Sequence, residues 1–109
     1  MKTTLQILED ALVLVIDGWA QHVWAQDKDG CAVDVGSPKA ACFCSEGAII
    51  RANGGTFGLG QVYERLKEAI STELTIPDWN DVPERTHEEV IAAITRAIEL
   101  EKKLLEVAV

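Results

Sequence analysis

Cys44 is the side chain of this sequence best suited to nucleophilic chemistry. A cysteine hydrolase needs a thiolate, a base that takes its proton and a group that orients the base. The sequence offers His22 or His87 as the base and Asn80 or Asp81 as the orienting group. No spacing along the chain brings either histidine beside the thiol. A small enzyme that uses Cys44 with Asn80 or Asp81 is therefore an alternative hypothesis, and a buried, unreactive thiol is the simpler one.

The soft metal ligands of the sequence do not have the spacing of a metal site. A structural zinc ion needs four such ligands at the corners of a tetrahedron. Two of the cysteines, Cys42 and Cys44, are two positions apart, and on a helix such side chains point about 200° apart around the axis. Because this spacing does not fit such a site, we predict no metal site and no cofactor. The cysteines and histidines considered are Cys31, Cys42, Cys44, His22 and His87.

Trp79, Asn80 and Asp81 lie in a segment, residues 76–86, that contains two prolines. Proline fixes its own φ and keeps the preceding residue extended, and Asn and Asp bond readily to nearby backbone. We expect an ordered, irregular loop, with two open interpretations. Trp79 closes one end of a helical core while the Asn-Asp pair bonds the loop backbone, or these three residues form, with Cys44, one wall of a binding site.

The elements that would position these residues are predicted from apolar side chains at helical spacing. We expect four helices, at residues 4–18, 40–52, 59–74 and from 86 onward. The first should stop at Gly18, a residue that commonly ends helices. The last should begin at Thr86, where Glu89 completes a capping box.

The second helix is expected to be the central one. Ser37 and Pro38 read as its start, and the small residues around Gly47 would let neighbouring backbone come close. We expect the other three helices to surround it and the Trp79 loop to cover one end. Between the first two helices, Asp-Gly at residues 29–30 predicts a β-hairpin that pairs residues 22–26 with 31–35.

Length, charge and cysteine number limit the class of protein. The 109 residues make one domain, and its net charge is −8, from 18 acidic and 10 basic residues. Such a field repels phosphate, so we predict no direct nucleic-acid binding. The longest apolar run, residues 11–16, is far shorter than a membrane span, and the N-terminal residues lack a secretory signal pattern. An odd number of cysteines, three, favours a reducing compartment, so we expect a cytoplasmic protein.

Two segments of the sequence resemble a known family. Residues 43–49, Phe-Cys-Ser-Glu-Gly-Ala-Ile, are similar to an aromatic-Cys-x-x-Gly-Ala-Leu pattern. Residues 79–86, Trp-Asn-Asp-Val-Pro-Glu-Arg-Thr, are similar to an aromatic-Asn-Asp-x-Pro-x-x-Thr pattern. Together they resemble a bacterial and phage family of small stand-alone domains of unknown function. The resemblance implies no activity, and its pattern positions here are Cys44, Gly47, Ala48, Asn80, Asp81, Pro83 and Thr86.

The expected protein is thus a mainly α, four-helix single domain, residues 1–109, with a small β-hairpin between the first and second helices. Its expected function is that of a small acidic binding or interaction protein, an accessory or phage-derived factor with Trp79, Asn80, Asp81 and Cys44 at the binding site. The expected partner is a protein with a basic surface, because the net charge is negative. A homodimer built on Trp19, Trp24 or Val107 is a further hypothesis.

Overall fold

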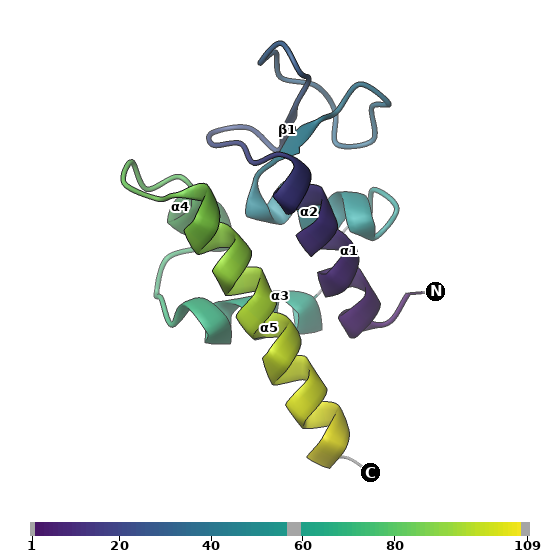
Figure 1. Ribbon diagram of the computed structural model, residues 1–109, viewed down its shortest axis with the longest axis vertical. Helices are drawn as coiled ribbons and strands as arrows, with labels where there is room; N and C mark the ends of the chain where they lie inside the picture. The colour runs from purple at the N-terminus through teal and green to yellow at the C-terminus, as the bar shows by residue number, and fades with distance from the viewer. Residues whose placement is uncertain (1, 57–59, 108–109) are drawn as a thin grey trace.

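The structure, a computed structural model, describes residues 2–56 and 60–107 and is mainly helical, as predicted (Figure 1). A small two-stranded antiparallel sheet lies between the first two helices. Within the described residues the elements are α1 (Thr4–Asp17), β1 (Ala25–Gln26), β2 (Cys42–Phe43), α2 (Ser45–Ala52), α3 (Gly60–Ile70), α4 (Ile76–Asn80) and α5 (His87–Val107).

α1 ends at Asp17 with Gly18 as its C-cap, but the physical reason for glycine differs from the one expected. Gly18 has extended backbone, with φ −174°, and is not in the left-handed conformation of a helix-ending glycine. A Cβ at this position would lie 2.4 Å from the carbonyl oxygen of Ala41. Glycine is needed here because the chain that leads into β2 passes directly over it.

The hairpin has a different second strand from the one predicted. β1 pairs with β2, with Ala25 opposite Phe43, whereas residues 31–35 contribute only an isolated bridge between Gln26 and Ala32. The turn at residues 27–30 does form, with the Gly30 N–H donating to the Asp27 carbonyl. Phe43 is 2% exposed, so pairing with β2 adds an aromatic side chain to the core that residues 31–35 cannot supply.

α2 begins at Ser45, so the prediction of a helix from residue 40 was wrong for its first turns. Ser37 and Pro38 form a turn instead, in which the Ala40 N–H donates to the Ser37 carbonyl. The N–H of Phe43 donates to the Gly18 carbonyl, and the N–H of Cys44 donates to the Trp24 carbonyl. These long-range bonds keep the chain extended up to Cys44, which is the N-cap of α2 and does not lie inside the helix.

The segment predicted as an irregular loop contains a short helix, α4. The Thr75 side chain caps it by accepting a hydrogen bond from the Asp78 N–H, and Pro77 falls in the first turn, where its missing N–H costs nothing. The predicted capping box of α5 is confirmed, since Thr86 and Glu89 exchange hydrogen bonds of 2.9 and 3.2 Å.

α3 ends at Ile70 and does not continue to residue 74 as predicted, because Ser71 turns into a positive φ of 47°. The predicted start at Leu59 lies outside the described residues. No helix of the described residues combines the length and the apolar character that crossing a membrane requires.

α1, and not α2, is the central helix. It packs against α2 on one side and α5 on the other, while α3 packs on α5 (Figure 1). Fully buried side chains from all these helices meet in the core, among them Leu8, Val15, Ile49, Leu66 and Ile94. The prediction that the other three helices surround α2 was wrong, because the first turn of α2 packs against the segment that forms the small sheet. α4, which carries Trp79, packs against α2 and α3.

Candidate functional site

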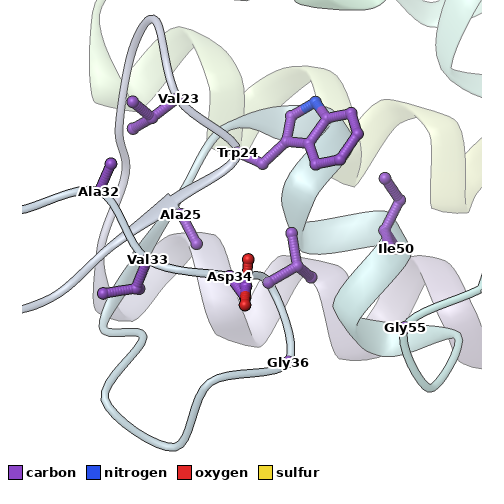
Figure 2. Close-up of a pocket in the computed structure, with 10 residues that line it drawn as sticks. Val23, Trp24, Ala25, Ala32, Val33, Asp34, Gly36, Ile50 and Gly55 are labelled. Carbon is purple, nitrogen blue, oxygen red and sulfur yellow. The ribbon is translucent and has the colours of Figure 1, made fainter.

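Two cavities lined by described residues border Trp24, the residue before β1. The first, called here the apolar cavity, has a volume of about 450 Å³ and lies between residues 23–25, residues 32–36 and Ile50 of α2 (Figure 2). The second, called the Cys44 cavity, has a volume of about 330 Å³. Trp24 is 48% exposed, and it is the largest apolar side chain at this site.

The start of α2 fixes the position of Trp24. The Trp24 carbonyl accepts a hydrogen bond of 3.2 Å from the Cys44 N–H. A Cβ on Gly47 would lie 2.0 Å from the same carbonyl oxygen, so only glycine lets the helix approach this closely. The Trp24 side chain hydrogen-bonds to the Glu46 carboxylate, whose pKa is raised by burial and lowered by this bond. Backbone and indole are therefore both held by α2.

Asp34 brings a negative charge to the apolar cavity. Its exposed side chain lies near the centre of the lining residues in Figure 2 and has no hydrogen bond or ion pair to a described residue. The loop around it is fixed by Arg51, which donates hydrogen bonds to the carbonyls of Val35 and Ser37. No described residue that lines either cavity is a lysine or arginine.

The Cys44 cavity brings together three residues that the sequence places far apart. Cys44, His22 and Asp81 all line it. The Asp81 carboxylate accepts a hydrogen bond of 2.9 Å from the His22 N–H, and its second oxygen lies 3.8 Å from the His22 ring nitrogen Nδ1. The predicted pair of Cys44 and Asp81 thus shares one cavity, and so does a histidine that the chain spacing did not suggest.

The Cys44 thiol is poorly suited to nucleophilic attack near neutral pH. It is 3% exposed, and burial raises its pKa to about 11. Its Sγ accepts a hydrogen bond of 3.2 Å from the Gly47 N–H, which lowers the pKa in part, while the charges of Glu46 and Asp81 raise it. Only the thiolate is a strong nucleophile, so a protonated Cys44 acts as a helix cap and core residue.

Asn80 and Trp79 lie behind the cavities. Asn80 is fully buried, and its Oδ1 accepts hydrogen bonds from the Trp19 indole and from both the N–H and the hydroxyl of Ser45. Its amide NH₂ donates to Ala20 O and to the Asp81 carboxylate. This amide has no capacity left for a ligand.

Trp79 is 7% exposed, and the Arg85 guanidinium lies 4.0 Å over its ring. Of the four predicted binding residues, Cys44 and Asp81 are at a cavity and Trp79 and Asn80 support it.

The predicted soft ligands do not converge. Among residues 2–56 and 60–107, no group of three or more His, Cys, Asp or Glu side chains could hold a metal ion. His87 stacks on Trp19 with ring centroids 6.0 Å apart, and Cys31 is exposed in the turn region. Behind Cys44, the Tyr63 hydroxyl is buried without a hydrogen-bond partner, and burial raises the pKa of Tyr63 to about 12.

A comparison with protein families decides where this chain belongs. The model of the family described as "Family of unknown function (DUF6197)" matches residues 1–100. The chain belongs to this family. The resemblance to a family of small domains of unknown function is therefore confirmed. No curated protein and no solved structure matches the chain.

Sequence reasoning missed Asp34 in this DUF6197 chain, gave no reason to place His22 near Cys44, and treated Trp24 only as a dimer residue. One signal for Trp24 was present. Neighbouring residues of a strand point to opposite faces. Of Trp24 and Ala25, the smaller side chain of Ala25 is the one that fits a closely packed core. An extended chain that turns Ala25 inward therefore turns Trp24 outward.

Proposed function

We propose that this protein is a non-enzymatic, cytoplasmic binding module that holds a protein partner at the two cavities beside Trp24. One observation carries the proposal. A half-exposed Trp24 stands between an apolar cavity that contains Asp34 and a second cavity that contains Asp81, and no described lysine or arginine lines either of them. A partner surface that is apolar in part and basic in part complements this arrangement.

Two physical terms favour such a partner. Burying the exposed part of an indole in a preformed, apolar setting is a common source of hot-spot binding energy. Trp24 is already held by Glu46 and by the start of α2, so little side-chain entropy is lost on binding. The net charge of −8 adds long-range attraction for a basic partner.

The cytoplasmic setting of the proposal is supported by the cysteines, since Cys31, Cys42 and Cys44 are all free thiols. The accessory or phage-derived role, and the homodimer, stay predictions from the sequence. Sedimentation of the wild-type chain and of Trp24→Ala tests the dimer, because a dimer built on Trp24 would dissociate in the variant.

Selection of random displayed peptides on the immobilised protein tests the proposed function. We expect the selected peptides to combine apolar and basic residues and to bind more weakly as salt rises. Trp24→Ala should weaken them by roughly tenfold or more. Leu105→Ala is the matched control, because Leu105 is 47% exposed and lies near the far, C-terminal end of α5 (Figure 1). Peptides that bind Trp24→Ala as tightly as wild type would contradict the proposal.

A second candidate function is a cysteine-dependent reaction in the Cys44 cavity. Cys44, His22 and Asp81 line the same space, which favours this function. The thiol pKa of about 11 opposes it, and this is why it ranks second. Alkylation of Cys44 that is faster than that of an ordinary thiol near neutral pH would reverse the ranking.

A further inference from the structure

We propose that the apolar cavity receives the side chain of a partner's arginine, with its guanidinium against the Trp24 indole and paired with the Asp34 carboxylate. This inference rests on the proposed binding function and names the residue that is recognised. The partner is a protein with an exposed arginine in an otherwise apolar segment.

The lining of the apolar cavity suits the two parts of an arginine side chain. Apolar residues of the cavity lining, among them Val35 and Ile50, supply walls for the methylene stem. Asp34 supplies the charge for the head group, and its carboxylate has no described partner of its own. A volume of about 450 Å³ has room for one such side chain and its backbone.

The two groups that would contact the guanidinium are held in place before binding. The Trp24 side chain is hydrogen-bonded to Glu46. The loop that carries Asp34 is held by Arg51, whose Nη1 lies 2.7 Å from the Val35 carbonyl and 2.9 Å from that of Ser37. Nη1 of Arg51 is used by these backbone oxygens, and Arg51 makes no ion pair with the Asp34 carboxylate.

The protein contains the proposed arrangement once already. The Arg85 guanidinium lies 4.0 Å over the ring of Trp79, and its Nη1 lies 3.2 Å from the Glu89 carboxylate. The apolar cavity offers the same two groups, an indole and a carboxylate, without an arginine between them. Arginine fits better than lysine because its flat, delocalised head stacks on an indole and donates two parallel hydrogen bonds to a carboxylate.

Titration of the ¹⁵N-labelled protein with capped single residues tests the inference. The probes are N-acetyl-arginine methylamide, the same compound of lysine, and the same compound of citrulline, the uncharged analogue of arginine. We expect the arginine probe to shift the Trp24 indole signal, assigned by its loss in Trp24→Leu. The citrulline probe should bind about tenfold more weakly, and the lysine probe should also bind more weakly than arginine.

Variants separate the contributions of the two groups. Asp34→Asn should weaken the arginine probe severalfold and leave the citrulline probe unchanged, while Leu105→Ala should change neither. Equal binding of the arginine and citrulline probes, or no effect of Asp34→Asn, would overturn the inference.

Displayed peptides separate this inference from the proposed function. Peptides that need Trp24 but keep their affinity when each arginine becomes citrulline would leave the binding module intact and remove the arginine site. Free arginine probe that binds while no peptide does would show a small-molecule guanidine site and overturn the assignment to a protein partner.

Discussion

Replacing Asn80 by alanine should strongly destabilise this protein. The side chain is fully buried and joins three segments of the chain. Its Oδ1 accepts bonds of 2.8 Å from the Trp19 indole and of 3.0 and 2.7 Å from the N–H and hydroxyl of Ser45. Its Nδ2 donates to the Ala20 carbonyl at 3.0 Å and to Asp81 at 2.9 Å. Asn80→Ala removes all of these bonds together.

The expected loss follows from which partners can reach water. Ser45 is also fully buried, so its N–H and hydroxyl stay unsatisfied, and each such group costs about 1–3 kcal/mol. Asp81 is partly exposed and keeps the hydrogen bond from the His22 N–H, so losing its bond to Asn80 costs little free energy. We expect a total of about 3–5 kcal/mol, a large part of the roughly 5–15 kcal/mol that stabilises a domain. The melting temperature should fall on the order of 20 °C.

Urea unfolding followed by circular dichroism measures this loss, with Asn53→Ala as the control. Among the described residues, the Asn53 amide bonds only to Thr56, in an exposed turn, so its removal should cost less than about 1 kcal/mol. If Asn80→Ala and Asn53→Ala lowered the free energy of unfolding equally, the conclusion that the Asn80 side chain holds three segments of the chain together would be wrong.

Three further outcomes are expected. Gly47→Ala should cost at least about 2 kcal/mol in urea unfolding, because the added Cβ would lie 2.0 Å from the Trp24 carbonyl oxygen. Gly60→Ala, whose added Cβ would have no atom of the described residues within 4 Å, should be neutral or stabilising, and equal losses in the two variants would contradict the Gly47 contact. Iodoacetamide should label Cys44 about a hundredfold more slowly than an ordinary thiol near pH 8, because its pKa is about 11 instead of 9.0. Exposed Cys31 is the internal standard for mass spectrometry of the labelled protein, and equal labelling would show that Cys44 is accessible and that its pKa is not raised. The same raised pKa means that the folded thiol keeps its proton to a higher pH than the unfolded thiol, so stability should fall by up to about 2–3 kcal/mol as pH rises from about 9 to 11. Cys44→Ala should lack this part of the fall in urea midpoint, and an unchanged pH profile would refute the assignment.

The features that were predictable from the sequence are those set by local chemistry. The periodicity of α1 and the capping box of Thr86 and Glu89 depend on residues close together in the chain, and both are present. The turn at residues 27–30 also formed. Each of these elements satisfies its own polar groups, so its sequence is sufficient to indicate it.

The errors came from bonds between distant segments. The Phe43 N–H donates to the Gly18 carbonyl and the Cys44 N–H donates to the Trp24 carbonyl, and these bonds keep the chain extended where a helix was predicted. The start of α2 shifted by five residues as a result. Cys44 thereby moved from the middle of a helix to its cap, beside a cavity.

The sequence indicated some residues that line the cavities, but neither Asp34 nor the position of Trp24 between the two cavities. The sequence indicated Cys44 and Asp81, and the structure places both at one cavity. It could not indicate that Asn80 has all its hydrogen-bonding capacity used internally, since its partners are up to 61 residues away. Nor could it place Asp34 beside Trp24, because that arrangement depends on how the loop of residues 31–36 folds back.

The junction at Asn80 also constrains when the chain can acquire its native shape. The residues that bond to its side chain include Trp19 and Ser45, which precede it by 61 and 35 positions. A ribosome must therefore release the segment through residue 80 before those earlier partners can be satisfied. Loops of this size close at an entropic cost that only their final contacts offset. Trp19 and Ser45 are thus synthesised early, but their hydrogen bonds to Asn80 can form only after residue 80 has left the ribosome.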